Sequence, residues 1–328
     1  MKERIIGIDI LKFFAVFLII NSHMGSMYVN FHELATGGTI GNLLFFFCSG
    51  FTLFLKPFES VKAFPNWYKK RIIRIYPAVL AVAIVTCLFF GNNLNIVDII
   101  ICGGQWFVPA IMVMYVFIYF VGLFARERVG WVIAIISLAV IIWFYLMDRP
   151  FPFGMFGNES CNIRWLLYFL FMFFGAWMGL HSAEHKSMAG RQWLNLILAL
   201  LCIVAFYVIS GLTDRYRSVE YLHVFCFIPL LLGIYFLYWW CEGNFAKSIY
   251  NSKVGHFIIR FIGGLCLEIY LIQNWLITDK LNNLFPLNIL IIFIVVVISA
   301  YLCRILARLI LQTFRAAPYD WKQMVSAF

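Results

Sequence analysis

The sequence predicts an all-α, polytopic integral membrane protein with about ten transmembrane helices. Of its 328 residues, 64% are hydrophobic and only 12% are charged, and the mean hydropathy is +0.91. This composition lies outside the range of soluble globular domains. Apolar windows of about 20 residues, the length that crosses a bilayer as a helix, recur at 5–23, 39–56, 72–90, 105–124, 129–147, 163–180, 193–211, 221–241, 256–278 and 287–311. We therefore expect one transmembrane domain over residues 1–328 and no separate soluble domain.

The sequence defines the ends of some spans more clearly than those of others. The first, 5–23, has Asp9 and Lys12 within its apolar run, and no small-residue cleavage pattern follows it. We therefore predict a retained helix and not a secretory signal peptide. The second and third spans have soft boundaries, and the stretch 94–104 fits either an interfacial or re-entrant segment or the start of the fourth span. Pro109 is expected to kink that fourth span.

The basic residues predict how these spans are oriented. Most of the 25 lysine and arginine residues fall in loops on the same side as the N-terminus, and loops rich in these residues stay in the cytoplasm. With an even number of crossings, both termini are predicted to be cytoplasmic. The net charge of +10 is explained by topology and by contact with anionic membrane lipids, so we expect no nucleic-acid partner.

Metal-ligating residues are sparse in this sequence. The nine cysteines are scattered without a C-x-x-C motif, and nearly all fall inside spans, where they are predicted to be small apolar packing residues. His181 and His185 have a spacing that can hold a metal, but no third ligand accompanies them. We therefore predict no metal site.

Three polar residues of the first span are candidates for function. Lys12 and His23 are eleven residues apart, which places them on one face of a helix and about 16 Å apart along its axis. Asp9, three residues before Lys12, shares this side and can pair with it. Ionisable groups inside a membrane are costly unless they face a partner or water, and histidine exchanges protons near neutral pH. Alternatively, Lys12 snorkels to the headgroups and His23 caps the outer end.

A cluster of cationic residues enters the third span in "FPNWYKKRIIRIYP", residues 64–77. Arg71 and Arg74 are one helical turn apart and point the same way. Their two guanidinium groups suit a multiply charged phosphate ligand. The alternative is a positive-inside cluster that only fixes the topology.

Several segments together resemble the membrane-bound acyltransferase family 3. They are "DILKFFAVFLIINSH" in the first span, followed by "FFFCSGF", "KKRIIRIYP", "QWFVPAIMVMY" and, late in the chain, "CLEIYLIQNWL". A basic residue followed by ten residues and a histidine, combined with an R-x-x-R pair, is the most specific part of this resemblance. The resemblance runs from about residue 5 to residue 280, nearly the whole chain.

The resemblance implies a bacterial inner-membrane acyltransferase, most often an O-acetyltransferase. Such an enzyme uses cytoplasmic acetyl-CoA as co-substrate, has no permanently bound cofactor, and acylates a hydroxyl of an envelope or exported glycan, a lipid-linked sugar or a small molecule. His23 corresponds to the family's catalytic histidine, Lys12 to its basic partner, and Arg71 and Arg74 to the pair expected to hold the CoA phosphates. Two positions depart from the common pattern: Lys12 stands where arginine is more usual, and Gln273 stands where many members carry histidine.

Further residues are predicted to line the cavity in which donor and acceptor meet: Asp9, Trp106, Glu268, Tyr270 and Gln273. Aromatic residues near span ends more often belong to interfacial belts, and this alternative applies to Trp106 and Tyr270. The rival function is a secondary transporter or flippase, which also needs about ten spans and buried charges, although inverted halves and Gly/Pro-broken helix pairs are not evident. A catalytically inactive scaffold or sensor is the third alternative.

Overall fold

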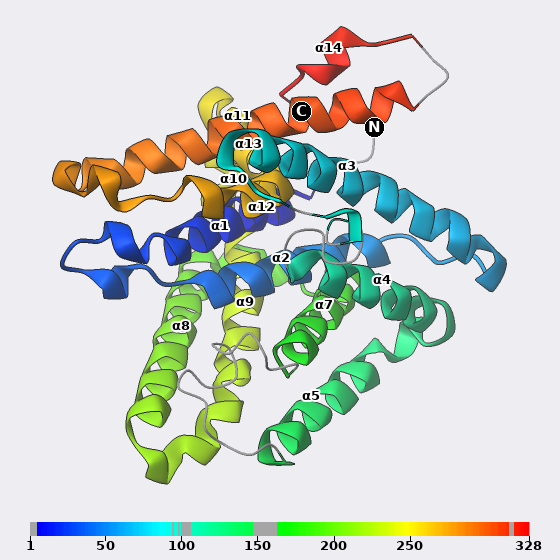
Figure 1. Cartoon of the computed structure of the whole chain (residues 1–328). Coiled ribbons are helices and arrows are strands. Elements are labelled where there is room, and N and C mark those ends of the chain that lie inside the picture. Colours follow the sequence, from blue (N-terminus) through cyan, green and yellow to red (C-terminus); the bar gives the residue numbers. More distant parts are fainter. Residues whose placement is uncertain are drawn as a thin grey trace. The chain divides into compact units, whose positions relative to one another are not determined.

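The computed structural model describes residues 5–93, 95–97, 99, 106–146, 163–314 and 318–327, and within these residues it contains helices and no strand (Figure 1). The long helices are α1 (Ile6–His23), α2 (Gly38–Phe54), α3 (Phe64–Phe90), α4 (Phe107–Phe124), α5 (Val129–Leu146), α7 (Ile163–His181), α8 (Gln192–Arg215), α9 (Phe227–Cys241), α11 (Lys253–Gly264), α12 (Cys266–Leu276) and α13 (Leu287–Thr313). The short helices are α10 (Asn244–Asn251) and α14 (Trp321–Met324). Single 3-10 segments used below are η1 (Gly25–Met27), η7 (Arg217–Cys226) and η8 (Asp279–Leu284).

The predicted all-α, multi-pass membrane fold is confirmed. Each predicted span corresponds to a helix or, for the ninth, to a pair of helices. Among the described residues, eight helices are long and apolar enough to cross a membrane, and the bent pair α11 and α12 makes a ninth if it is one span. Helix α7 has 19 residues, is not among the eight, and carries Arg164 and His181 near its ends. Of the stretch 94–104, only 95–97 and 99 are among the described residues.

Two helix starts differ from the sequence prediction. Helix α3 begins at Phe64 and not at residue 72, because Pro65 fits the first turn of a helix and the cationic residues after it are good helix formers that reach solvent. Arg71 and Arg74 consequently lie inside a continuous helix. The expected kink at Pro109 is wrong: this residue falls in the first turn of α4, where backbone N–H groups have no partner within the helix in any case.

The predicted ninth span, 256–278, is broken. Helices α11 and α12 are bent by 72° relative to each other at Leu265. Gly263 and Gly264 directly precede the break, and paired glycines are a common cause of sharp bends because they weaken the helix locally. The sequence prediction of one continuous helix is therefore wrong at this point.

The chain divides into two compact units, each described by itself below. Unit 1 comprises Met1–Leu11, Asn42–Phe58 and Phe120–His256. Unit 2 comprises Lys12–Gly41, Glu59–Tyr119 and Phe257–Phe328. The boundary near the N-terminus falls within α1, so this helix contributes its residues up to Leu11 to unit 1 and the remainder to unit 2.

In unit 1, helices α2 and α7 approach backbone to backbone. A Cβ atom at Gly50 would overlap the carbonyl group of Met172, and one at Gly175 would overlap the carbonyl group of Phe47. Small residues that permit such close approach are typical of helix pairs in membranes. The pairs α5 with α7 and α8 with α9 also pack directly in this unit.

In unit 2, helices α3, α12 and α13 pack against one another. The start of α13 is tied to the segment that follows α1, because Asn288 Nδ2 donates a hydrogen bond of 3.0 Å to the Met27 carbonyl. In η8, Asn282 Nδ2 donates a hydrogen bond of 2.8 Å to the Ser26 carbonyl. The end of α1, the segment η8 and the start of α13 therefore lie at the same end of unit 2.

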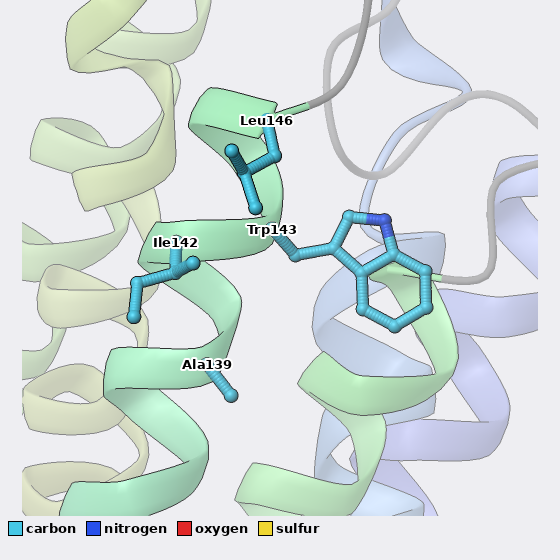
Figure 2. A pocket seen from close by; sticks show the side chains of 4 residues that line it. All are labelled: Ala139, Ile142, Trp143 and Leu146. Carbon is cyan, nitrogen blue, oxygen red and sulfur yellow. The ribbon is translucent and has the colours of Figure 1, made fainter.

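The outward faces of several helices are apolar. Only 22% of the span that contains α5 and 17% of the span that contains α8 is buried, which fits helices that face lipid. On α5, four side chains of one helix face line a hollow of about 440 Å³ (Figure 2); they are Ala139, Ile142, Trp143 and Leu146. Among the described residues no ionisable side chain lines this hollow, and we assign it to the lipid-facing surface.

Candidate functional site

The predicted phosphate ligands Arg71 and Arg74 lie in the first half of α3, in unit 2. The guanidinium carbon of Arg71 stands 4.7 Å from the ring centroid of Trp67, one turn earlier, and 6.0 Å from that of Tyr115 on α4. Aromatic faces attract a cation in this position. Arg71 is half-buried, whereas Arg74 is exposed. The two rings thus fix Arg71 while Arg74 reaches outward from the same side of the helix.

Neither arginine is neutralised by a carboxylate within the described residues. The ion pairs there join Lys247 to Glu242, Arg304 to Glu268 and His223 to Asp214. Among the described residues, the Nε atom of Arg71 is buried and has no hydrogen-bond partner. Lys69 and Lys70, which directly precede Arg71 in the sequence, are exposed. Two guanidinium groups without an acidic partner form a surface that suits a multiply charged anion.

Aromatic contacts between α3 and α4 support this surface. Trp67 packs against Tyr119, with ring centroids 5.0 Å apart, and the Tyr119 hydroxyl donates a hydrogen bond of 2.6 Å to the Ser60 carbonyl. The Tyr68 hydroxyl donates to the Met112 carbonyl at 3.4 Å. These contacts hold the first turns of α3 against α4 and so fix the direction in which Arg71 points.

The predicted catalytic residues His23 and Lys12 lie on α1, which is one uninterrupted helix over Ile6–His23. His23 is its last residue and is exposed, and Lys12 is half-buried near its middle. Because the helix is continuous, both side chains occupy one face about 16 Å apart, as their spacing predicts.

Asn21 braces the segment that follows His23. Its Nδ2 atom donates to the carbonyls of Leu34 and Thr36, at 2.7 and 3.0 Å, and its Oδ1 atom accepts from the Tyr28 hydroxyl at 2.5 Å. A tyrosine hydroxyl is protonated at neutral pH in any case, and burial raises the pKa of Tyr28 further. Sequence reasoning missed Asn21, whose partners lie between seven and fifteen positions later in the chain.

Asp9 has a different neighbour from the one expected. It accepts a hydrogen bond of 2.9 Å from the Tyr250 hydroxyl, and the Tyr250 ring packs against His256 at 5.0 Å. No ion pair joins Asp9 to Lys12 within the described part of the chain. Asp9 and Tyr250 both belong to unit 1.

Glu268, the acid expected to line the cavity, is paired with Arg304 of α13. Arg304 Nε donates to Oε1 at 3.0 Å and Nη2 donates to Oε2 at 2.8 Å. Arg304 Nη2 also donates to the Gly264 carbonyl. Only 9% of the Glu268 side chain is exposed, and a carboxylate this deep needs a charged partner. Sequence reasoning missed Arg304 because it treated this residue as a topology signal.

Trp106 and Tyr270, each predicted to line the cavity, lie close to each other in unit 2. Their ring centroids lie 6.4 Å apart, and Phe107 packs on Tyr270 at 4.8 Å. Tyr270 is buried, which argues against an interfacial belt at this position. Gln273, one turn later, is fully buried, and neither of its amide atoms has a hydrogen-bond partner among the described residues. Such a group costs about 1–3 kcal/mol of stability.

Histidines elsewhere in the described residues have structural neighbours. His181 Nδ1 lies 2.9 Å from the Trp177 carbonyl. His223 Nδ1 lies 2.6 Å from the Thr213 hydroxyl oxygen and 3.8 Å from a carboxylate oxygen of Asp214. Within the described ranges, no three His, Cys, Asp or Glu side chains gather in a way that would hold a metal ion.

A comparison with known families places the chain in one class. Residues 5–308 match the acyltransferase 3 family, whose description is "Acyltransferase domain". This chain therefore belongs to that family and is a multi-pass membrane acyltransferase. The match covers both units and every site residue named above. No curated protein and no solved structure matches the chain.

Proposed function

We propose that this protein is an O-acetyltransferase that takes acetyl-CoA from the cytoplasm and passes the acetyl group to a hydroxyl across the membrane. The observation that carries the proposal is the Arg71 and Arg74 pair, of which one guanidinium is held by Trp67 and Tyr115. The acceptor is a hydroxyl-bearing molecule: an envelope or exported glycan, a lipid-linked sugar or a small molecule.

The chemistry of CoA supports the assignment of the donor end. CoA carries phosphate groups at one end and its thioester at the other, and arginine forks bind phosphate oxygens in pairs. Arg71 lies 19 residues before the end of α3 at Phe90, which is about 28 Å along the helix axis. In the proposal the phosphates stay at Arg71 and Arg74, and the acyl arm extends toward the other end of unit 2, where α1 ends at His23.

His23 is proposed to be the general base. It accepts the proton of the acceptor hydroxyl while the hydroxyl oxygen attacks the thioester carbonyl carbon. The carbon–sulfur bond then breaks, and the same proton passes from His23 to the leaving CoA thiolate. Lys12, on the same face of α1, is proposed to act at a distance by attracting the anionic donor, since about 16 Å separates it from His23.

The proposed location is the bacterial inner membrane, with both termini in the cytoplasm. Loops rich in lysine and arginine remain on the cytoplasmic side, and the exposed Lys69, Lys70 and Arg74 would then face cytoplasmic acetyl-CoA and anionic lipid headgroups. His23 would lie toward the opposite side, where an exported acceptor arrives.

The first experiment is a thermal shift of the purified, detergent-solubilised protein with acetyl-CoA. We expect a rise of the unfolding midpoint with ligand that is lost in the Arg71→Ala/Arg74→Ala double variant, whose affinity should fall by about 100-fold. The Lys69→Ala/Lys70→Ala double variant removes the same charge from neighbouring positions and should retain most of the shift. No shift of the folded wild type at millimolar acetyl-CoA would reject the donor assignment.

The purified, detergent-solubilised protein also tests whether His23 is the general base. His23→Ala should bind acetyl-CoA as the wild type does but transfer acetyl at least about 100-fold more slowly, since a general base contributes this much. Full transfer by His23→Ala at equal expression would show that the proposed mechanism is wrong.

A transporter or flippase remains the second candidate, and the bent pair α11 and α12 is the observation that favours it. Broken helices near the membrane midplane are typical of transporters. The two functions differ in their need for the donor: a transporter moves solute without acetyl-CoA, whereas the enzyme consumes acetyl-CoA and releases free CoA.

A further inference from the structure

The amide of Gln273 on α12 is buried and makes no hydrogen bond to any described residue. None of the residue is exposed, and neither Nε2 nor Oε1 has a hydrogen-bond partner among the described residues. Buried polar side chains nearly always have partners. A buried amide without a hydrogen-bond partner lowers the stability of the fold. Side chains that bind ligands commonly carry such a cost.

Other buried amides of unit 2 show that the fold can satisfy such groups. Gln312 Nε2 donates to the Asp320 carbonyl at 3.2 Å, and its Oε1 accepts from the Asp320 N–H at 2.8 Å. Asn288 likewise uses both its amide nitrogen and its amide oxygen. Gln273 therefore differs from comparable side chains in the same unit.

Gln273 lies toward the end of unit 2 to which the proposed function assigns the acceptor. Trp275, two residues later, packs against Phe90 at the C-terminal end of α3, with ring centroids 5.8 Å apart. Beyond α12, Asn282 donates to a backbone carbonyl of the segment that follows His23. Gln273 thus lies far from the guanidinium pair and toward the end of α1 at which His23 stands.

The amide geometry limits the ligand that satisfies both atoms. A primary amide presents a donor and an acceptor side by side. A thioester carbonyl offers only acceptors, and the trans amides of the CoA arm carry their N–H and C=O on opposite edges. Two neighbouring hydroxyl groups of a polyol offer a donor and an acceptor on adjacent atoms and match both positions at once.

We propose that the Gln273 amide is a specificity-determining residue that binds two neighbouring hydroxyls of the acceptor, so that the acceptor is a polyol such as a sugar ring and not a simple alcohol. This inference rests on the proposed function for its placement of the acceptor. Gln273 binds and orients the acceptor, and His23 takes the proton from the hydroxyl that is acylated.

The test compares two small probes, trans-cyclohexanediol with neighbouring hydroxyls and cyclohexanol, on the full-length protein in detergent. The diol should raise the unfolding midpoint of the wild type more than cyclohexanol does, and Gln273→Leu should lose this difference. In acetyl transfer, the preference for the diol over cyclohexanol, as a ratio of kcat/KM values, should fall by about tenfold. The KM for acetyl-CoA should stay within about twofold of the wild-type value.

The stability of the unliganded variants separates binding from a structural role. Gln273→Leu should unfold at the same temperature as the wild type or higher, because it removes an unsatisfied polar group. Gln312→Leu, the matched control, should unfold at a lower temperature and keep the preference for the diol. A destabilised Gln273→Leu that still discriminates between the probes would overturn the inference, as would a wild type that binds both probes equally.

A failure of the proposed function gives a different result. If the wild type binds the diol through Gln273 but transfers no acetyl group, the role of Gln273 is supported and the proposed acetyl transfer is rejected. If the wild type transfers acetyl but Gln273→Leu keeps the full preference for the diol, the chemistry stands and the role of Gln273 is rejected.

Discussion

Three polar side chains on membrane helices of unit 2 differ in how far the free-energy cost of their burial is offset. They are Arg71, Glu268 and Gln273. Arg71 lies against the rings of Trp67 and Tyr115, an interaction worth about 0.5–2 kcal/mol. Glu268 is held by a bidentate pair with an arginine. Gln273 has no partner among the described residues. Arg71 and Gln273 therefore keep hydrogen-bonding capacity that a ligand can use, whereas Glu268 does not.

The cation–π contact between Arg71 and Trp67 can be tested directly. Trp67→Leu removes the aromatic face 4.7 Å from the guanidinium, so Arg71 should lose its fixed direction and the Kd for acetyl-CoA should rise by about three- to tenfold. Trp67→Phe keeps an aromatic face and should lose less. Titration of both variants with acetyl-CoA in a thermal-shift assay checks this. Equal affinities of the wild type and Trp67→Leu would mean that the ring only fills space.

At the scale of elements, the break between α11 and α12 is stabilised from a neighbouring helix. Arg304 of α13 bonds the carbonyl of Gly264, the last residue of α11, and the carboxylate of Glu268 in the first turn of α12. A single side chain thus joins both sides of the bend. Since α12 carries Tyr270 and Gln273, this contact fixes the position of the part of the candidate site that lies on α12.

Breaking this ion pair should be costly, and removing both partners should not. Arg304→Met leaves a buried carboxylate without its partner and should lower the free energy of unfolding by about 3–5 kcal/mol. The double variant Glu268→Leu/Arg304→Met should recover most of that loss. Unfolding in detergent, with activity as a second readout, measures both. If the double variant were as unstable as Arg304→Met, the bond to Gly264 and not the ion pair would carry the stabilisation.

At the scale of the whole molecule, the chain has an apolar exterior and two compact units that both fall within the family match of residues 5–308. Helices α5 and α8 expose most of their surface, which water would not tolerate but lipid does. The C-terminal segment is fixed to α13: Arg308 Nη1 donates to carbonyls of Gln323, Met324 and Ser326. The tail therefore stays at the end of α13 that carries Arg304 and Arg308.

This arrangement gives a prediction for topology. A fluorescent protein fused to the C-terminus should fold and fluoresce, and alkaline phosphatase fused at the same place should be inactive, because the tail lies beside arginines that the positive-inside rule predicts to be cytoplasmic. An active phosphatase fusion would place the C-terminus outside and reverse the proposed sides of donor and acceptor.

The sequence by itself determined the class of the protein and the positions of its helices. Apolar windows of membrane length located the long helices of the described residues, with α11 and α12 inside one window, since in lipid the backbone must satisfy its own hydrogen bonds within each segment. His23, Lys12, Arg71 and Arg74 could also be singled out as candidates, because helical spacing places each pair on one face. The roles proposed for them follow from the resemblance to the family. The start of α3 at Phe64 was missed, because a cytoplasmic helical turn need not be apolar.

Only the tertiary structure decided which side chains meet. Tyr115 beside Arg71, Arg304 on Glu268 and Tyr250 on Asp9 all come from helices distant in sequence. No local pattern encodes these pairs, since they depend on how helices pack and not on how each helix forms. The unpartnered amide of Gln273 belongs to the same class: its sequence neighbours predict a helix, and only the packed structure reveals that nothing in the described chain bonds to it.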